Sequence, residues 1–594
     1  MKHFCPVPLL VILVFVAGTR SFGDTALNNF VTQLLRIEAG KAAAADAYHF
    51  ENPRRGWIFL RALTGTGTSD GIALAIDASA ENGSHGHVIH QGINGKPLEV
   101  MRYLSAGKHT VEVTVADGAR LDSLIVRTMP EILYANFPMS AITKAYPRYD
   151  WAYLKRIGML DNINTIVGAR RGGYEREKSE WRGMGRRWIV ECPVIGLPGG
   201  EKVTADQAYD FWRPHRGLSG PELDGVIADE FYPARRENYG AWVSALSRIQ
   251  GEIGDRVFIP YVAGSPEGLR DFLAPLTKSG VRFAYETYLH ERPTEAEARA
   301  FLKERLSDRM TRLNAVVPGA AGNAIIVLGL LSAPNESLSK YPLANYKVYM
   351  DMQFNILAND PAFKGLYGVM EYLTAYADEE YLRWAVHLYR HYCIEGKTDM
   401  LSVDPYTLTH VSNPNFEDGT DGWDVSAAAE GSVTTGSMDG YGWLMLFYPK
   451  DNQGDTFLTM KRVAAKPNSV SQVIGDLEPG RYYSVKLFTS DRNNLGTEAK
   501  HAVSIRLDNV DVIPDKCFRE VFHNCYSHEA HGFNYENKAW FNYHFLVFRA
   551  KGKTAGITIS DWADESDPNG AIGQELSFNF VEIEPYLMDS ADDQ

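Results

Sequence analysis

The stretch Gly225-Val-Ile-Ala-Asp-Glu-Phe-Tyr232 decides how the centre of this chain is interpreted. A short apolar run ends in two adjacent acids and two aromatic residues. This is typical of a buried parallel strand that delivers polar groups at its carboxyl end. Seven further runs of this kind lie between residues 131 and 405. In chain order, the eight runs are residues 132–135, 164–168, 188–192, 225–229, 257–261, 282–285, 324–328 and 366–370.

Segments with a helical spacing of apolar residues lie between these runs. They are residues 149–157, 238–253, 266–278, 293–313, 338–357 and 378–392. Strands that alternate with helices form parallel sheets covered by helices, and eight such units predict a (β/α)8 or TIM barrel. An open doubly wound sheet is the alternative. It is less favoured because no glycine-rich phosphate turn follows the first run.

Both sides of the barrel region have the pattern of antiparallel sheets. From residue 24 to 130, short alternating runs between turns predict a β-sandwich. The clearest runs are residues 56–61, 71–77, 109–115 and 121–127. Alternating runs return from residue 406 to 594. We therefore expect a multidomain protein with an N-terminal β-sandwich (24–130), a catalytic barrel (131–405) and a C-terminal β-sandwich of jelly-roll type (406–594).

Residues 1–23 have the features of a secretory signal peptide. Lys2 precedes the apolar stretch 8–17, and small and polar residues follow up to Asp24. The stretch is shorter than the roughly 20 residues that a membrane-spanning helix needs. We expect cleavage after this segment, a secreted or periplasmic protein, and no membrane span in the mature chain.

Charge and cysteine content argue against several classes of protein. The formal net charge of −14 disfavours nucleic acid as a partner, because binding to phosphates needs a basic surface. Five cysteines are too few for a disulfide scaffold, and no zinc-type Cys/His spacing is evident. Cys517 and Cys525 are close enough in sequence for a local disulfide, whereas Cys192 and Cys393 are expected to be buried apolar side chains.

The C-terminal part carries motifs of a known kind of module. Asn413-Pro-Asn-Phe-Glu417 is followed by Gly422-Trp423 and later by Leu477-Glu-Pro-Gly-Arg-Tyr-Tyr483. These motifs resemble those of the jelly-roll carbohydrate-binding and galactose-binding-like modules of secreted polysaccharide hydrolases. The resemblance implies that Phe416 and Trp423 pack the sandwich and that Glu417 binds a structural calcium ion. The chain as a whole resembles a secreted multidomain glycoside hydrolase with a TIM barrel.

In such barrels the catalytic groups lie at the carboxyl ends of the strands. Glycoside hydrolysis needs two carboxyl groups, one as proton donor and one as nucleophile or base. Glu230, after the fourth run, and Glu286, after the sixth, are the expected pair. Adjacent strand residues point opposite ways, so Asp229 is expected to support Glu230 by hydrogen bonding, although the turn could reverse the two. Glu371, after the eighth run, is the reserve catalytic candidate.

Further residues near the strand ends are candidates for substrate binding. They are Asn136, Glu191, Tyr232, Tyr261, Tyr288 and His290. Aromatic faces among them suit the apolar side of a sugar ring. Arginine pairs at 170–171, 186–187 and 235–236 also flank predicted strands. They are interpreted either as solvated surface charge or as a subsite for sulfated or uronate sugars, in which Arg171 would bind the anion.

The leading hypothesis is a glycosidase that acts on a polysaccharide or oligosaccharide and uses no cofactor for catalysis. The distance between the two catalytic carboxyl groups would decide the stereochemical outcome. About 5 Å indicates retention of the anomeric configuration, and about 6.5–9.5 Å indicates inversion. Two alternatives stay open. One is a non-catalytic glycan-binding protein, and the other is a polysaccharide lyase with Tyr288 or His290 as base and Arg171 neutralising a uronate. The sequence contains no phosphate-binding loop, His-Glu-x-x-His helix or Gly-x-Ser-x-Gly turn.

Overall fold

The computed structural model describes residues 24–38, 45–64, 72–77, 90–91, 97–115, 121–169, 172–197, 200–445, 454–525 and 528–589. The chain divides into two compact units. The first comprises residues 1–26 and 32–128, and the second comprises residues 27–31 and 129–594. The expected signal peptide lies outside the described residues. Within the described ranges, no helix has both the length and the apolar composition needed to cross a membrane.

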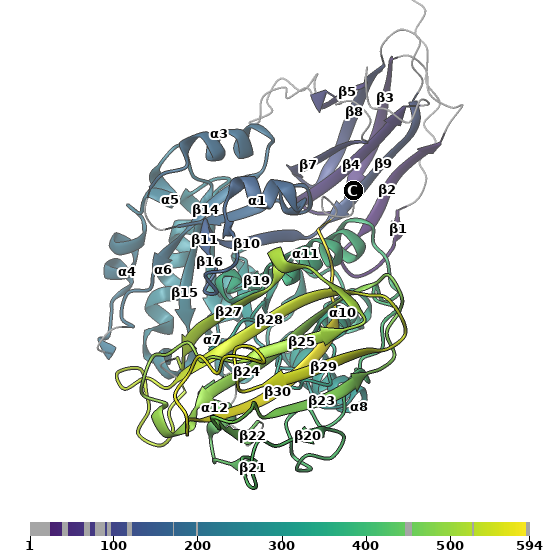
Figure 1. The fold of residues 1–594 in the computed structure, drawn as a ribbon. Coiled ribbons are helices and arrows are strands. Elements are labelled where there is room, and N and C mark those ends of the chain that lie inside the picture. The colour runs from purple at the N-terminus through teal and green to yellow at the C-terminus, as the bar shows by residue number, and fades with distance from the viewer. Residues whose placement is uncertain are drawn as a thin grey trace, which may run out of the picture. The chain divides into compact units, whose positions relative to one another are not determined.

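The first unit contains two antiparallel sheets (Figure 1). One sheet has the order β1 (Thr25–Ala26), β2 (Thr32–Glu38), β9 (Leu121–Met129), β4 (Gly56–Thr64) and β7 (Leu98–Leu104). The other has the order β3 (Ala45–Asn52), β8 (Gly107–Val115), β5 (Ile72–Ile76) and β6 (His90–Gln91). Both contribute to one apolar core that includes Leu35, Ile58, Leu74 and Val111. The four runs expected to be strands are β4, β5, β8 and β9, which confirms those predictions.

The second unit contains a closed barrel of eight parallel strands (Figure 1). In barrel order they are β10 (Glu131–Phe137), β13 (Thr165–Gly168), β14 (Arg187–Pro193), β15 (Gly225–Phe231), β16 (Val257–Val262), β17 (Phe283–Thr287), β18 (Ala324–Gly329) and β19 (Gly368–Tyr372). Each predicted run coincides with one strand. The closed order confirms the eight-stranded barrel and rules out the open sheet. A separate short pair is formed by β11 (Met139–Ser140) and β12 (Arg148–Tyr149).

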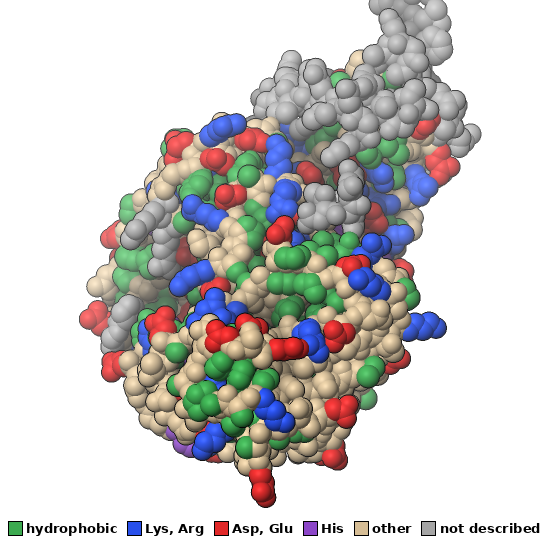
Figure 2. All heavy atoms as spheres, in the orientation of Figure 1, with side chains coloured by type: hydrophobic (Ala, Val, Ile, Leu, Met, Phe, Trp, Pro, Cys, Tyr) green, Lys and Arg blue, Asp and Glu red, His purple; other side chains and the backbone are tan. Residues whose placement is uncertain are grey.

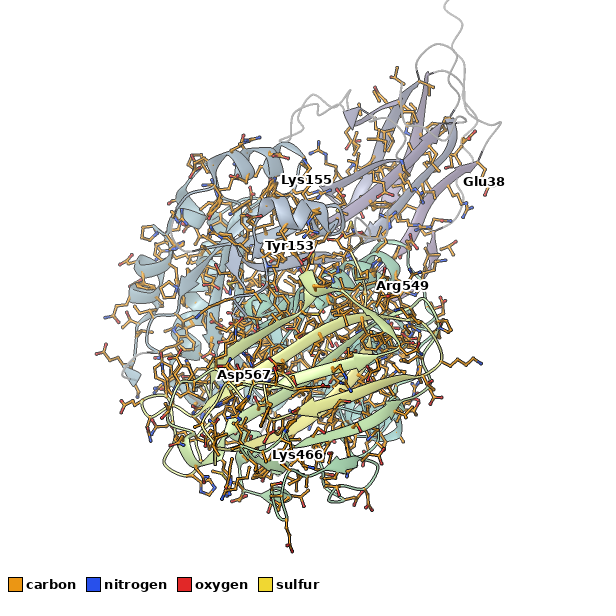
Figure 3. The ribbon with its side chains drawn as sticks, in the orientation of Figure 1. Glu38, Tyr153, Lys155, Lys466, Arg549 and Asp567 are labelled. Carbon is orange, nitrogen blue, oxygen red and sulfur yellow. The ribbon has the colours of Figure 1, made fainter. Side chains whose placement is uncertain are left out.

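Helices occupy the segments between barrel strands. The α-helices are α1 (Trp151–Arg156), α2 (Met159–Asn162), α3 (Glu175–Gly183), α4 (Ala205–Trp212), α5 (Arg216–Ser219), α6 (Tyr239–Glu252), α7 (Pro266–Lys278), α8 (Glu295–Leu302), α9 (Arg309–Val316), α10 (Tyr346–Asn359) and α11 (Glu379–Leu388). Shorter 3-10 or π turns are η2 (Pro233–Asn238), η3 (Lys303–Asp308), η4 (Ala321–Asn323), η5 (Pro361–Phe363), η6 (Thr374–Tyr376) and η7 (Tyr389–Ile394). On α1, Tyr153 is buried while Lys155 is exposed (Figure 3), the amphipathic division expected of a helix that packs on one side.

One helix begins later than its sequence pattern predicted. Residues 338–357 have helical spacing, yet α10 starts at Tyr346. The Glu291 carboxylate accepts hydrogen bonds from the backbone N–H groups of Lys340 and Tyr341, at 2.6 and 2.7 Å. These bonds hold the segment before α10 out of helical conformation, and the Asn345 side chain then caps the helix through the backbone N–H of Val348.

The C-terminal part of the second unit contains two antiparallel sheets. The larger has the order β21 (Val433–Ser437), β22 (Thr456–Lys461), β30 (Glu575–Pro585), β24 (Tyr482–Asp491), β28 (Trp540–Ala550) and β26 (Val510–Val512), with β27 (Phe518–His523) also paired to β28. The smaller has the order β20 (Asp424–Ser426), β23 (Ser469–Ile474), β29 (Ala555–Ser560) and β25 (Ser504–Asp508). The remaining helical elements are α12 (Tyr441–Met445), η8 (Arg492–Asn494) and η9 (Pro514–Lys516). Phe416 and Trp423 lie in the core that the two sheets share, with ring centroids 5.2 Å apart, so their predicted packing role is confirmed.

Buried charges join the barrel helices to the C-terminal sheets within the second unit. Lys347 of α10 pairs with Glu380 of α11 at 2.9 Å and with Glu584 of β30 at 2.8 Å. The Tyr381 hydroxyl donates to the same Glu584 carboxylate at 2.8 Å, and Lys486 of β24 lies 3.3 Å from it. Because these groups are buried, the Lys347–Glu584 ion pair couples the barrel helices to the C-terminal sheets.

The predicted disulfide between Cys517 and Cys525 is wrong. All four cysteines in the described ranges are free. The Cys517 thiol donates to the carbonyl of Ile513, whereas the Cys525 thiol contacts Glu336 and a histidine. Cys192 and Cys393 are buried, as predicted.

Charged side chains of both signs are interspersed on the face drawn in Figure 2. The whole chain has a formal net charge of −14. This distribution differs from the clustered basic surface with which proteins bind nucleic acid phosphates.

Candidate active site

The barrel interior is apolar through its middle and becomes polar at the carboxyl ends of its strands. The apolar interior includes Ile189, Ile227 and Ala284. Side chains alternate along a strand, so the residue two positions further on points to the same side. Two positions after these apolar residues stand Glu191 on β14, Asp229 on β15 and Glu286 on β17. Three strands therefore deliver carboxyl groups to one end of the barrel.

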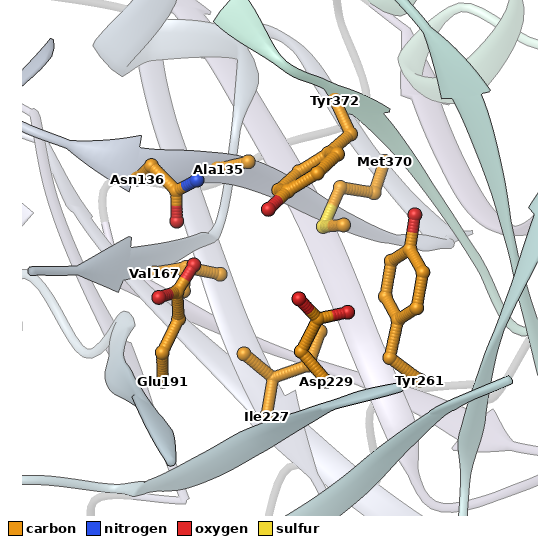
Figure 4. Close-up of a pocket in the computed structure, with 9 residues that line it drawn as sticks. All are labelled: Ala135, Asn136, Val167, Glu191, Ile227, Asp229, Tyr261, Met370 and Tyr372. Carbon is orange, nitrogen blue, oxygen red and sulfur yellow. The ribbon is translucent and has the colours of Figure 1, made fainter. Parts of the chain in front are cut away.

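A small pocket opens at this end. Its lining residues come from β10, β13, β14, β15, β16 and β19, and they are Ala135, Asn136, Val167, Glu191, Ile227, Asp229, Tyr261, Met370 and Tyr372. Figure 4 shows the carboxyl groups of Glu191 and Asp229 pointing toward the same space as the Asn136 amide and the Tyr372 hydroxyl. Polar groups thus surround an apolar floor of Val167, Ile227 and Met370, the usual composition of a small-molecule site.

Asp229, rather than Glu230, is the acid of β15 that lines the pocket. Asp229 is partly buried, whereas the next residue, Glu230, is exposed. The apolar interior contact of Ile227 sets the alternation that turns Asp229 inward. The expectation that Glu230 faces the substrate with Asp229 behind it is therefore corrected: Asp229 lines the pocket and Glu230 does not.

Glu286 is the acid whose protonation the site perturbs most clearly. Burial raises the pKa of its carboxyl to about 7, and the negative charges of Glu230 and Asp229 add to the effect. The charge of Arg309 and a hydrogen bond from Tyr261 oppose it. A carboxyl in this state is partly protonated at neutral pH, as a general acid must be.

Three tyrosines surround these acids. The hydroxyl groups of Tyr261 and Tyr288 lie 2.7 Å apart, and the ring of Tyr372 stacks on that of Tyr288 with centroids 6.3 Å apart. The Tyr372 hydroxyl is hydrogen bonded to the side chain of Asn136. Asn136 has a φ of 59°, a left-handed conformation that asparagine tolerates better than most residues. The structure thus brings four predicted binding residues, Asn136, Tyr261, Tyr288 and Glu191, to the same end of the barrel.

Glu371 lies outside this group. Its neighbours along β19, Met370 and Tyr372, line the pocket, so alternation turns Glu371 to the outer surface of the barrel. There it is hydrogen bonded to Tyr389, and burial raises the pKa of its carboxyl to about 8. The reserve catalytic role predicted for Glu371 is not consistent with this position.

Four predicted site residues, Glu286, Tyr288, His290 and Tyr232, are not among the residues that line the pocket. His290 is buried with its ring 5.1 Å from that of Phe301, and its Nε2 lies 3.1 Å from a guanidinium nitrogen of Arg292. Tyr232 is partly exposed directly after β15. Arg171, predicted to bind an anionic sugar, lies outside the described residues.

Arg186 and Arg187 have structural partners away from the pocket. Arg187 opens β14 and forms a buried ion pair with Glu131 at 3.0 Å, at the amino ends of the strands. Arg186 contacts the carbonyl of Leu160 and lies over the Trp181 ring at 4.6 Å. For these two arginines, the structure does not support the alternative interpretation as an anionic-sugar subsite.

No protein-family model matches the sequence, and no curated protein matches it. Solved structures match at low similarity. A ruminal GH26 endo-β-1,4-mannanase has 11% identity over 63% of this chain and 92% of its own, with a TM-score of 0.25. A GH2 β-galacturonidase from Eisenbergiella tayi has 10% identity over 59% of this chain and 89% of its own, with a TM-score of 0.27. The carbohydrate-binding module TmCBM61, solved with β-1,4-galactotriose, has 16% identity over 30% of this chain and 97% of its own, with a TM-score of 0.17.

At these identities and TM-scores, the matches establish neither a common activity nor a common substrate. The function of this chain therefore follows from the chemistry of its own site.

Proposed function

We propose that the barrel hydrolyses a glycosidic bond in a polysaccharide or oligosaccharide. The observation that carries this proposal is Glu286, whose carboxyl has a pKa raised to about 7 and lies within reach of the charge on the pocket acid Asp229. Two neighbouring carboxyl groups with different protonation are the requirement for glycoside hydrolysis.

In the proposed reaction, protonated Glu286 gives its proton to the glycosidic oxygen as the bond from that oxygen to the anomeric carbon breaks. Ionised Asp229 either attacks the anomeric carbon or takes a proton from the water that attacks it. In the first case, water later cleaves the glycosyl ester and Glu286 recovers its proton from that water. In the second, water supplies the new hydroxyl directly. Both routes consume one water and yield a new reducing end.

Other residues at this end of the barrel suit a sugar. Tyr261, Tyr288 and Tyr372 offer aromatic rings for the apolar side of a pyranose. Asn136 and Glu191 offer an amide and a carboxylate for its hydroxyl groups. We assign these five residues to substrate binding.

The wider architecture fits an exported enzyme. We propose that residues 1–23 are a cleaved signal peptide, that residues 131–405 form a catalytic (β/α)8 barrel, and that residues 24–130 and 406–594 are β-sandwiches. A glycan-binding role for the C-terminal sandwich and a calcium ion at Glu417 belong to the same proposal. Glu417 is exposed next to the buried Phe416, where a surface cation could reach it.

A lyase mechanism has less support. Burial raises the pKa of Tyr288 well above its ordinary value, with a further contribution from the charge of Glu286, so its hydroxyl is a poor base at neutral pH. The other candidate base, His290, does not line the pocket. Neither residue has the environment that proton abstraction from a uronate requires.

The test measures reducing-sugar release from a panel of neutral and anionic polysaccharides. Glu286→Gln and Asp229→Asn should each lower release by at least about 100-fold, the lower range for a positioned acid or base. Glu304→Gln, at an exposed acid of η3, is the matched control and should retain activity. Circular dichroism verifies folding of each variant. Full activity in both pocket variants would contradict the assignment, and an unsaturated product would indicate a lyase.

A further inference from the structure

Three side chains that the proposed reaction does not use meet in the second unit. Among the described residues, Glu336, Cys525 and His528 form a group whose potential ligand atoms all lie within 4.8 Å of one another. The Cys525 sulfur is 2.8 Å from a carboxylate oxygen of Glu336 and 2.8 Å from Nδ1 of His528. A thiol, an imidazole and a carboxyl group therefore converge on one point.

The surrounding structure holds this arrangement in place. The backbone N–H of His528 donates to the carbonyl of Cys525, which closes a turn. Buried Asn524 fixes the turn from both sides, because its amide donates to the His528 carbonyl at 2.7 Å and its oxygen accepts from the Ala539 N–H at 2.8 Å. The Trp443 ring packs edge-on against the His528 ring with centroids 4.2 Å apart.

The third group arrives from a distant part of the chain. Glu336 lies 189 residues before Cys525, in the segment between β18 and α10. Asn335, directly before it, has a φ of 70°. Cys525 and His528 are largely removed from solvent, with 7% and 0% exposure. Glu336 is partly buried beside them. A bound cation would neutralise the Glu336 carboxylate and a Cys525 thiolate in this largely enclosed place.

We propose that Cys525, His528 and Glu336 bind a divalent cation of the zinc class. Thiolate and imidazole ligands favour Zn²⁺ and disfavour Ca²⁺ and Mg²⁺, which prefer oxygen. Tetrahedral zinc would separate sulfur from oxygen or nitrogen by about 3.6 Å, given bonds of about 2.3 and 2.0–2.1 Å. The sulfur–oxygen and sulfur–nitrogen distances of 2.8 Å would each lengthen by less than about 1 Å to reach that geometry. Three protein ligands leave a fourth position for water or another ligand.

This cation would connect the segment after β18 to the C-terminal sheets. The same segment is hydrogen bonded to the end of β19, where the Leu330 N–H donates to the carbonyl of the pocket residue Tyr372. The metal would therefore stabilise the contact between the barrel and the sheets. The site is separate from the carboxyl groups assigned to hydrolysis.

The experiment uses the mature full-length chain, tag-free and reduced. Metal analysis after dialysis against Zn²⁺ should find one bound zinc per chain, and Co²⁺ titration should produce the near-ultraviolet band of a thiolate–cobalt bond. Cys525→Ser should abolish that band and weaken zinc binding by more than about 100-fold, beyond the losses that outer-shell changes cause. Glu336→Gln tests the carboxylate ligand without altering the turn.

Cys517→Ser is the matched control, because Cys517 is partly buried in the same part of the chain and bonds only to backbone groups among the contacts resolved for it. It should leave the band and the affinity unchanged. Zinc should also raise the melting temperature of the parent and the control but not of Cys525→Ser. Absence of zinc and of the cobalt band in the parent would overturn the proposal, as would a band that persists in Cys525→Ser.

Discussion

Glu286 owes its raised pKa to burial and to two acids at the same end of the barrel. Burial is the largest cause of its raised pKa, followed by the charge of Glu230 and then by that of Asp229. Glu230 is exposed, so it acts on Glu286 through its field without lining the pocket. Both acids of β15 therefore raise the pKa of Glu286, and Asp229 also lines the pocket.

We expect activity to fall as pH rises through about 7, because the general acid then loses its proton. Glu230→Gln removes a negative charge that raises the pKa of Glu286. The alkaline limb of the pH–kcat/KM profile should move to lower pH by up to about one unit, with activity at acidic pH largely retained. A loss of activity at every pH would instead indicate that Glu230 takes part in the reaction.

Glu371 provides a pH effect on stability. Burial raises its pKa from the ordinary 4.5 to about 8, so the folded chain holds this proton over a range in which the unfolded chain has lost it. Its contribution is fully present below pH 4.5 and is lost as pH rises toward 8, by about 1.4 kcal/mol per pH unit for one proton. Glu371→Gln lacks this titration, so the difference in the free energy of unfolding between parent and variant should show this slope when it is plotted against pH. Equal slopes in parent and variant would contradict the buried, protonated state.

At the scale of elements, one buried acid links the amino ends of four barrel strands. Glu131 of β10 pairs with Arg187 of β14 and accepts hydrogen bonds from Thr165 of β13 at 2.7 Å and from Tyr367, just before β19, at 2.6 Å. Burial by itself would raise the pKa of Glu131, but Arg187 and these hydrogen bonds outweigh it and lower the pKa. The group therefore stays ionised and closes the barrel opposite the pocket.

Glu131→Gln leaves the Arg187 charge buried without its counterion. We expect a loss of about 3–5 kcal/mol in the free energy of unfolding at pH 7, measured by denaturant titration. The loss should shrink as pH falls through the folded-state pKa of Glu131, since the parent then loses the same charge. The double variant Glu131→Gln, Arg187→Met should recover part of the stability. If the change in the free energy of unfolding of the double variant equals the sum of the changes in the two single variants, the ion pair contributes little.

At the scale of the whole molecule, the barrel and the C-terminal sheets depend on shared charges. Burial would raise the pKa of Glu584, but the ammonium groups of Lys347 and Lys486 lower it. One carboxylate of β30 thus neutralises cations from both α10 and β24. The two parts should unfold together, because separating them breaks the buried Lys347–Glu584 ion pair.

Lys347→Met tests this dependence. It removes the cation between Glu380 and Glu584, and we expect unfolding at pH 7 to become easier by about 3–5 kcal/mol. Lys466→Met, at an exposed lysine labelled in Figure 3, is the matched control and should change stability by no more than about 0.5 kcal/mol. A small effect at Lys347 would indicate that water reaches the network.

Local patterns predicted the elements of this fold well. The helix α7 spans the residues expected from its spacing, and all eight barrel strands lie where apolar runs occur. The start of α10 was not predictable, because Glu291 reaches it from another loop. The helices α3 and α4 were missed. In α3 only Lys178 and Trp181 are buried, so its apolar pattern is weak.

The sequence by itself determined the barrel and the strand ends that carry acids, because periodicity follows from the local geometry of helices and strands. Only the tertiary structure decided which acid faces inward. Asp229 lines the pocket and Glu371 does not, since closure of the barrel sets the direction of each side chain. The meeting of Glu336 with Cys525 and His528 also required the folded chain. A contact between residues 189 positions apart depends on packing, which no local pattern encodes.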